Sequence, residues 1–238
     1  MSSSPGHTVK AFDDDLTDLR GLVSQMGGLA EAAITSAMEA LVRRDLDGAA
    51  RVVQGDNRID EMESEIERQV VRLIALRAPM ADDLREVLAA LKISGVVERI
   101  GDYAKNIAKR VPMFQERRNL EPLSILPAMA RITSEMVRDA LDAFAERDPE
   151  KATAVCHADR RVDDFYNSLF RTLLTYMMEN PHTITDATHL LFIAKNLERV
   201  GDHATNVAEM VYFAATGTQM TQRPRGEDPL REQGEAEA

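Results

Sequence analysis

One segment of this 238-residue chain occurs twice, and this repeat constrains the fold more than any other feature. The sequence ERIGDYAKNIA begins at Glu98, and ERVGDHATNVA begins 100 residues later at Glu198. Upstream, RRDLDGAARVVQGDNRIDE aligns with ERDPEKATAVCHADRRVDD at an offset of 103 residues. The matched residues are largely charged and recur in the same order and helical phase, so chance explains them poorly. The chain is therefore predicted to be a tandem duplication of one structural unit.

Long stretches poor in Pro and Gly carry apolar residues every three or four positions, as amphipathic helices do. They predict an all-α fold, a tandem duplication of a three-helix bundle with six long helices. The predicted helices are Val9 to Arg44, Leu46 to Arg77, Ala81 to Lys109, Ala128 to Glu146, Pro149 to Met178 and Ile184 to Ala215. Prolines 112, 122 and 127 interrupt the pattern between the halves. The predicted division is a flexible N-terminus (1–8), a first repeat (9–118), a second repeat (119–216) and a disordered tail (217–238).

Charge and composition exclude several classes of protein. A net charge of −11 argues against nucleic-acid binding, which requires a basic face. The single cysteine, Cys156, excludes a disulfide framework and fits a reducing cytosol. The first residues do not resemble a signal peptide, and no apolar run approaches the roughly 20 residues that span a bilayer. We therefore expect a cytoplasmic protein that reaches a membrane only through partners.

Acidic residues four positions apart give the strongest functional signal. Such residues face one way from successive turns of a helix. If each half folds back as an antiparallel hairpin, at Pro79 in the first and between Asn180 and Pro181 in the second, all four acids of a half lie at one level. The eight candidate metal ligands are Asp56, Asp60, Glu98 and Asp102 in the first half, and Asp159, Asp163, Glu198 and Asp202 in the second.

Two structural interpretations compete with a metal site. One such pair alone is commonly a solvated helix face, and the adjacent arginines offer salt bridges but point elsewhere. Four repeated pairs at matched heights favour a cation site, because carboxylates about 5 Å apart repel by roughly 3 kcal/mol per pair. Oxygen ligands select hard cations such as Mg, Mn, Ca or Fe, with Zn and Ni less natural, and shared acids would allow a multinuclear cluster.

Three other residues near the acids have open roles. Gly101 and Gly201 lie between the acids of their pairs. They allow close approach of either a metal cluster or a neighbouring helix. His203 adjoins Asp202, but its repeat equivalent is Tyr103, which favours a structural role over metal ligation.

Residues 7 to 216 resemble the PhoU family, accessory regulators of bacterial phosphate-specific transport. The likeness rests on PMADDLREVLAALKISGVVERIGDYAKNIAKR and THLLFIAKNLERVGDHATNVAE, which hold both copies of the family's Glu/Asp-x-x-x-Asp signature. The resemblance implies two three-helix bundles, often as a homodimer, with metal ions or multinuclear clusters on the acidic motifs. It also implies a non-enzymatic negative regulator of phosphate uptake and phosphate-starvation signalling. Such a regulator links the ATPase subunit of a phosphate ABC transporter to a sensor histidine kinase.

Two other functions stay open. The first is a carboxylate-bridged metalloenzyme, although the Glu-x-x-His motif typical of helical di-iron sites is missing at Glu98 and Glu198. The second is a purely structural interaction module whose acids bind nothing. The sequence also lacks a phosphate-binding glycine loop, an HExxH motif and a nucleophile elbow, so a non-enzymatic metal-binding adaptor is favoured.

Overall fold

The computed structural model describes residues 5–114 and 124–220, with side chains from Phe12 onward. Its elements are α1 (Pro5–Arg43), α2 (Leu46–Arg77), α3 (Asp82–Ala108), the 3₁₀ helix η1 (Val111–Phe114), α4 (Leu126–Glu146), α5 (Pro149–Glu179), the 3₁₀ helix η3 (Pro181–Thr183) and α6 (Ile184–Thr216). No strand occurs within these ranges, so the predicted all-α class and six long helices are confirmed. None of the helices over the same ranges is both long and apolar enough to cross a membrane.

Two predicted helix starts were late, and proline is the reason in both cases. The first helix begins at Pro5 rather than Val9, and the fourth begins at Leu126 with Pro127 in its first turn. Proline is accepted there because the first amide groups of a helix have no intrahelical acceptor. The predicted flexible N-terminus therefore overlaps α1, and its residues 1–4 lie outside the described part of the chain. Residues 115–123, and residues 221–238 of the predicted tail, also lie outside the described part of the chain.

The turn between the first two helices of each repeat is built the same way twice. Arg44 and Arg147 both take left-handed backbone conformations, with φ of 55° and 56°. The aspartate that follows each arginine then caps the next helix: the Asp45 carboxylate accepts from the Gly48 amide, and the Asp148 carboxylate accepts from the two amides after Pro149. The duplication therefore extends to local backbone geometry.

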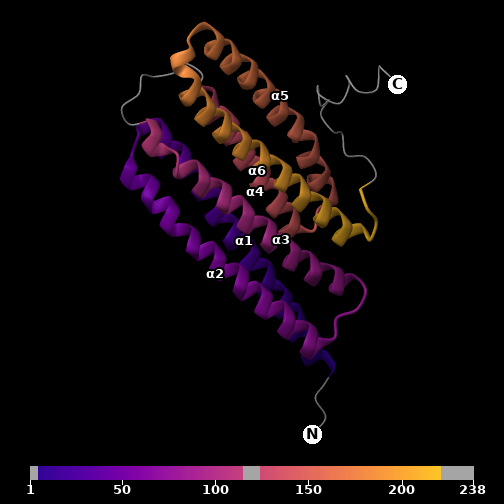
Figure 1. Cartoon of the computed structure of the whole chain (residues 1–238). Helices are drawn as coiled ribbons and strands as arrows, with labels where there is room; N and C mark the ends of the chain where they lie inside the picture. The colour runs from indigo at the N-terminus through magenta and orange to yellow at the C-terminus, as the bar shows by residue number, and fades with distance from the viewer. Residues whose placement is uncertain (1–4, 115–123, 221–238) are drawn as a thin grey trace, which may run out of the picture.

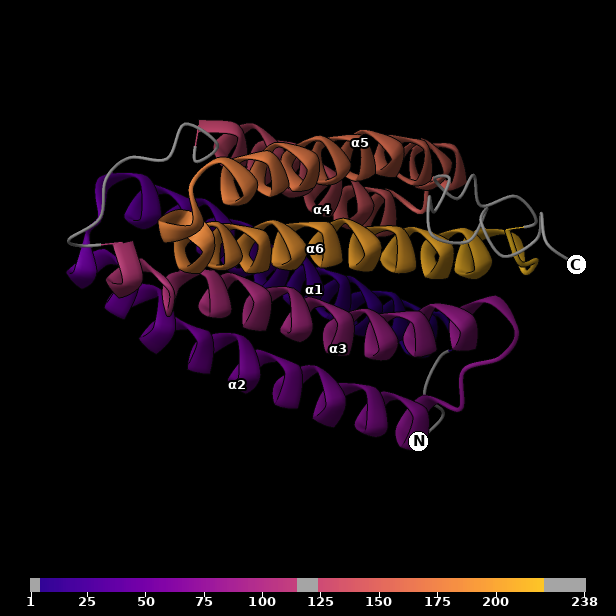
Figure 2. The same cartoon turned by 45° about the horizontal axis from the view of Figure 1, so that its top comes forward.

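The helices form two layers. Figure 2 shows α2, α3, α6 and α5 in that order across one face, with α1 and α4 behind them. In Figure 1 the helices run nearly along one axis, and α3 and α6 run in opposite directions side by side. The two repeats meet where α1 packs on α4 and α3 packs on α6. One continuous apolar core passes through both repeats, with Ile34, Ile66, Ile93, Met136, Leu169 and Leu197 almost fully buried within it.

Equivalent residues of the two repeats face each other at the centre of this contact. Tyr103 and His203 occupy matching positions, and their rings stack with centroids 5.4 Å apart. The Tyr103 hydroxyl also lies 3.1 Å from His203 Nε2. A contact between equivalent residues places a pseudo-twofold axis between α3 and α6.

A buried acid, Glu86, also joins the two repeats, several helical turns before Tyr103 on α3. Glu86, near the start of α3, is 3% exposed. Arg20 Nε of α1 lies 2.9 Å from its Oε1, and Arg147, after α4, forms an ion pair with its Oε2. Three charges from distant parts of the chain therefore meet at the junction of the two bundles.

Candidate functional site

The four predicted acids of the first repeat lie together on the α2–α3 hairpin. Helices α2 and α3 reverse direction around Ala78 and Pro79, and Asp56 of α2 faces Gly101 of α3. A Cβ atom on Gly101 would lie 3.3 Å from Asp56 Oδ1 and 2.8 Å from Ile59 Cδ1. The glycine therefore permits the tight helix packing that holds Asp56 level with Asp102. We call the group Asp56, Asp60, Glu63, Glu98 and Asp102 acidic cluster 1.

Burial and repulsion between neighbouring carboxylates raise the pKa of two acids in this cluster, Glu98 and Asp60. Partial burial raises the pKa of Glu98, and the carboxylates of Asp102, Glu63, Asp60 and Asp56 raise it further, in that order. Burial, then Asp56 and Asp102, likewise raise the pKa of Asp60. Glu63 was missed at the sequence level, because its equivalent in the second repeat is Tyr166 and the repeat does not mark the position. Its spacing of three residues after Asp60 could have identified it.

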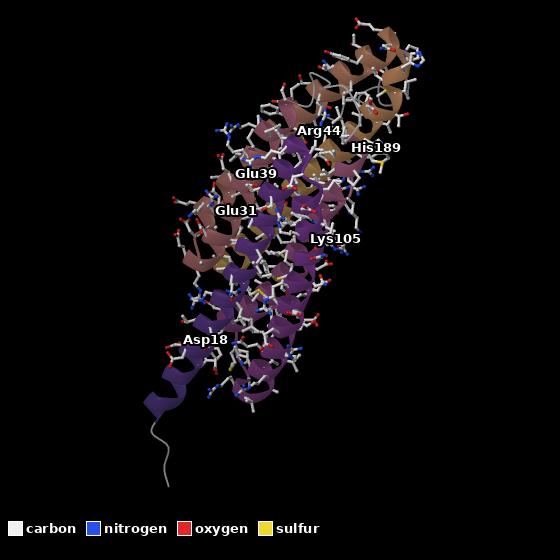
Figure 3. All side chains as sticks on the ribbon, turned by 90° about the vertical axis from the view of Figure 1, so that its left-hand side faces the viewer. Asp18, Glu31, Glu39, Arg44, Lys105 and His189 are labelled. Atoms are coloured by element: carbon white, nitrogen blue, oxygen red, sulfur yellow. The ribbon has the colours of Figure 1, made fainter. Side chains whose placement is uncertain are left out.

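Acidic cluster 1 contains a cationic side chain of the protein itself, that of Lys105. The Lys105 ammonium donates to Asp56 Oδ2 at 2.5 Å and to Asp102 Oδ1 at 3.0 Å, which joins α3 to α2 (Figure 3, where Lys105 is labelled). The Asp56 side chain is only 3% exposed. These two hydrogen bonds raise the pKa of Lys105 well above its ordinary value. Lys105 was also missed, since nothing in the helical spacing shows that its side chain crosses to α2.

The second repeat forms a related group, acidic cluster 2, from Asp159, Asp163, Glu198 and Asp202. Asp159 is 8% exposed, and a Cβ atom on Gly201 would lie 3.2 Å from its Oδ1, as at the first site. Burial raises the pKa of Glu198, against the hydrogen bond from Lys195, and the carboxylates of Asp202 and Asp163 raise it further. Lys195 Nζ lies 2.6 Å from Glu198 Oε1.

The donor set of these clusters fits a hard cation. In cluster 1 burial and the neighbouring carboxylates raise the pKa of Glu98 and of Asp60, and the Lys105 ammonium bridges Asp56 and Asp102. Within residues 5–114 and 124–220, no three His, Cys, Asp or Glu side chains converge closely enough to share one ion. The cation that two carboxylates of cluster 1 do share is the Lys105 ammonium.

The neighbouring arginines and His203 have structural contacts. Arg58 pairs with Glu61 at 2.9 Å, and the Arg199 guanidinium lies 5.9 Å from the centre of the Tyr103 ring. Burial, then the positive charge of Arg99, lowers the pKa of His203, which packs against Tyr103. The prediction that the arginines point away from the acids holds for Arg58 and Arg199.

The raised pKa values predict an unusual dependence of stability on pH. A carboxyl group whose pKa is higher in the folded state binds its proton more tightly there, so its stabilising contribution is full below the unfolded pKa and is lost as pH rises through the folded one. For Glu98 and Glu198 this loss begins near their ordinary value of 4.5. The double variant Glu98→Gln/Glu198→Gln, treated with chelator, should therefore be more stable than the unaltered chain at pH 7. This advantage should shrink toward pH 5.

Urea unfolding at several pH values measures this difference. Glu61→Gln is the control, because Glu61 is exposed in its pair with Arg58, and surface pairs contribute little. A double variant that is less stable at pH 7, or whose advantage is the same at pH 5, contradicts the prediction.

Comparison with known proteins identifies the family. The family model described as the PhoU domain matches residues 23–111 and 126–211, one copy for each repeat. The "Phosphate-specific transport system accessory protein PhoU homolog" of Zymomonas mobilis is 58% identical over 233 residues, which cover 98% of both chains. The homolog of Caulobacter vibrioides is 49% identical over 224 residues, 92% of this chain and 96% of that one. The crystal structure of PhoU from Pseudomonas aeruginosa superposes with a TM-score of 0.83 at 36% identity, covering 87% of this chain and 100% of that one. The chain belongs to the PhoU family.

Proposed function

We propose that this protein is a negative regulator of phosphate uptake and of phosphate-starvation signalling. Its relatives in Zymomonas mobilis and Caulobacter vibrioides are named accessory proteins of a phosphate-specific transport system, and the similarity spans nearly the whole chain. In this role the protein links the ATPase subunit of a phosphate ABC transporter to a sensor histidine kinase. It acts in the cytoplasm as a homodimer and reaches the inner membrane through these partners. The full-length similarity to accessory proteins is the observation that carries the proposal.

The acidic clusters support a metal-binding adaptor. Asp56, Asp60, Glu98 and Asp102 would hold ions in the first repeat, and Asp159, Asp163, Glu198 and Asp202 in the second, with Mg, Mn or Fe preferred over Zn or Ni. When bound, a metal ion supplies positive charge that offsets the repulsion among the carboxylates. In each repeat the four acids come from the two helices of one hairpin. Neutralising their charge therefore stiffens that hairpin and the surface that it exposes.

A non-enzymatic role fits the chemistry of these clusters better than the alternative of a carboxylate-bridged metalloenzyme. Helical di-iron enzymes typically place a histidine three residues after a ligating glutamate. In this chain Gly101 and Gly201 stand at those positions, and both face buried aspartates. An assay of the purified protein with iron and oxygen, or for phosphatase activity, would detect the enzymatic alternative.

Gene deletion and complementation test the regulatory role. Deletion should derepress phosphate-starvation genes at high phosphate, and the unaltered gene should restore repression. The variant Asp102→Ala/Asp202→Ala should fail to restore it, because each cluster loses one carboxylate. Its matched control is Asp18→Ala/Asp139→Ala, which removes the same charge from exposed positions on α1 and α4.

Two outcomes separate the parts of the proposal. Normal repression in the deletion strain contradicts the regulatory function itself. Elemental analysis of protein purified without chelator tests the metal: content that is substoichiometric, and unchanged in Asp102→Ala/Asp202→Ala, contradicts the adaptor's metal sites alone.

A further inference from the structure

The outer face of α5 carries a stripe of large, exposed apolar side chains. Phe170, Leu174 and Met178 follow one another at a spacing of four residues and are 44%, 47% and 77% exposed. Residues four apart lie on one face of a helix, so we call these three residues the α5 stripe. Helix α5 lies at the edge of the row of four helices in Figure 2 and packs on α4 and α6. Single exposed apolar residues need no explanation, but three on successive turns form a contiguous patch that indicates a binding surface.

A row of polar residues runs beside the α5 stripe, each one position later in the sequence. Arg171 begins this polar row, Thr175 is at its centre and Glu179 ends it, and all three are exposed. Neither Arg171 nor Glu179 forms an ion pair with another residue that the structure describes. The Thr175 hydroxyl donates to the Arg171 backbone carbonyl at 3.1 Å, so it can be buried without losing its hydrogen bond. The polar row therefore has opposite, unpaired charges at its two ends and a hydrogen-bonded hydroxyl between them.

Both rows are complementary to themselves in the antiparallel direction. If α5 meets an antiparallel copy of itself at Leu174, Phe170 lies level with Met178 of the partner subunit. Arg171 then lies within about 3 Å of the level of Glu179 of the partner subunit, at 1.5 Å per residue. Each charge follows its neighbour in the stripe by one position, so Arg171 and its partner lie on the same flank of the contact. An interface between two identical subunits about a twofold axis requires this self-complementarity.

The first repeat lacks such a pattern at the equivalent positions of α2. At the offset of 103 residues, the α5 stripe corresponds to Glu67, Val71 and Ala75, and the polar row corresponds to Arg68, Arg72 and Leu76. An antiparallel copy of α2 would place Arg72 against Arg72 of the partner subunit, and like charges in an interface repel. The self-complementary surface therefore belongs to the second repeat and is not a consequence of the shared helical fold.

We propose that two copies of this chain associate through the α5 stripe, with their α5 helices antiparallel about a twofold axis at Leu174. The inference rests on the homodimer of the proposed function and assigns an interface to it. The two stripes pack on each other, and Arg171 and Glu179 form two symmetric ion pairs between the chains that fix the register. Helix α2 lies at the opposite edge of the row, so the hairpins of the first repeat lie outermost in the dimer (Figure 2).

Sedimentation velocity of the full-length chain, at concentrations from about 1 to about 200 µM, tests the proposal. One helix from each copy makes a small interface, so we expect a dissociation constant on the order of 10 µM. Leu174→Glu places two carboxylates against each other at the axis and should weaken association at least about 100-fold. Val71→Glu is the matched control, because it makes the same kind of change at the equivalent position of α2, which is 67% exposed. Its dissociation constant should stay within about threefold of that of the unaltered chain.

Charge reversal tests the register of the two helices. Arg171→Glu and Glu179→Arg each place like charges opposite each other and should weaken association about 10-fold. The double variant Arg171→Glu/Glu179→Arg exchanges the two charges, so its dissociation constant should return to within about threefold of that of the unaltered chain. Arg68→Glu, the equivalent change on α2, controls for the altered net charge. These positions are exposed, so the charge variants decide the question even if Leu174→Glu does not fold.

Each failure has a distinct meaning. A dimer that Leu174→Glu and the charge reversals leave unchanged overturns the assigned interface and leaves the homodimer intact. A chain that stays monomeric up to about 200 µM overturns the homodimer and its interface together, whereas gene deletion judges the regulatory role separately. Co-sedimentation of such a monomer with phosphatidylglycerol vesicles, lost in Leu174→Glu, would overturn the proposal in favour of a lipid surface as the partner of the stripe.

Discussion

The double variant Arg20→Met/Arg147→Met should lose about 3–5 kcal/mol of unfolding free energy, because it leaves the Glu86 carboxylate buried without its two counterions. Glu86 is 3% exposed, whereas Arg20 and Arg147 approach it from α1 and from the α4–α5 turn. Methionine retains the unbranched aliphatic stem, so the loss reports charge more than packing. Urea unfolding at pH 7 measures it.

A triple variant tests whether the uncompensated charge is the cause. Adding Glu86→Met removes the buried carboxylate, and replacement of a whole buried ion group by apolar residues is often neutral or stabilising. The triple variant should therefore recover most of the lost stability. As a surface control, Arg58→Met breaks an exposed pair with Glu61 and should change stability by less than about 1 kcal/mol. A double variant as stable as this control, or a triple variant less stable than the double one, contradicts the explanation.

Valine at Gly101 and Gly201 should destabilise the protein by about 1–3 kcal/mol at each site through overpacking. A Cβ atom on Gly101 would meet Ile59 Cδ1 at 2.8 Å, and one on Gly201 would meet Asp159 Oδ1 at 3.2 Å. Each hairpin would have to separate or turn its buried aspartate away. Thermal and urea unfolding of the double variant measures the effect.

Gly28 provides the matched control for this substitution. It lies on α1 with nothing within 4 Å of an added Cβ atom, so Gly28→Val should be neutral or slightly stabilising, since valine has the higher helix propensity. Equal losses at Gly28 and Gly101 would contradict the overpacking explanation, because an added Cβ atom has no neighbour within 4 Å at Gly28.

The fold and the register of the hairpins could be predicted because both depend on local spacing. Apolar periodicity located the six helices, and the repeat indicated that they form two equivalent units. The assumption of an antiparallel reversal at Pro79 placed Asp56 level with Asp102, and the structure has Asp56 against the adjacent Gly101. In the second repeat, Asp159 lies against Gly201 in the same way.

The interactions that sequence spacing could not predict join residues from separate elements. Glu86 meets arginines about 60 residues away in both directions, and no periodic pattern relates such positions. The path of Lys105 to Asp56 depends on the direction its side chain takes across the hairpin. Glu63 was hidden for a different reason, since the argument from repetition ignores any position where the two copies differ.

The Tyr103–His203 contact shows what joining the two units in one chain makes possible. Two separate identical chains related by a true twofold axis must present the same side chain from both sides, giving a tyrosine pair or a histidine pair at that point. Within a single chain the two equivalent positions can carry different residues. Here the Tyr103 hydroxyl lies 3.1 Å from the His203 imidazole nitrogen. The same independence allows the first repeat to carry Lys105 where the second repeat carries Thr205. Joining the two units in one chain thereby allows equivalent positions of the two repeats to carry side chains with different chemistry.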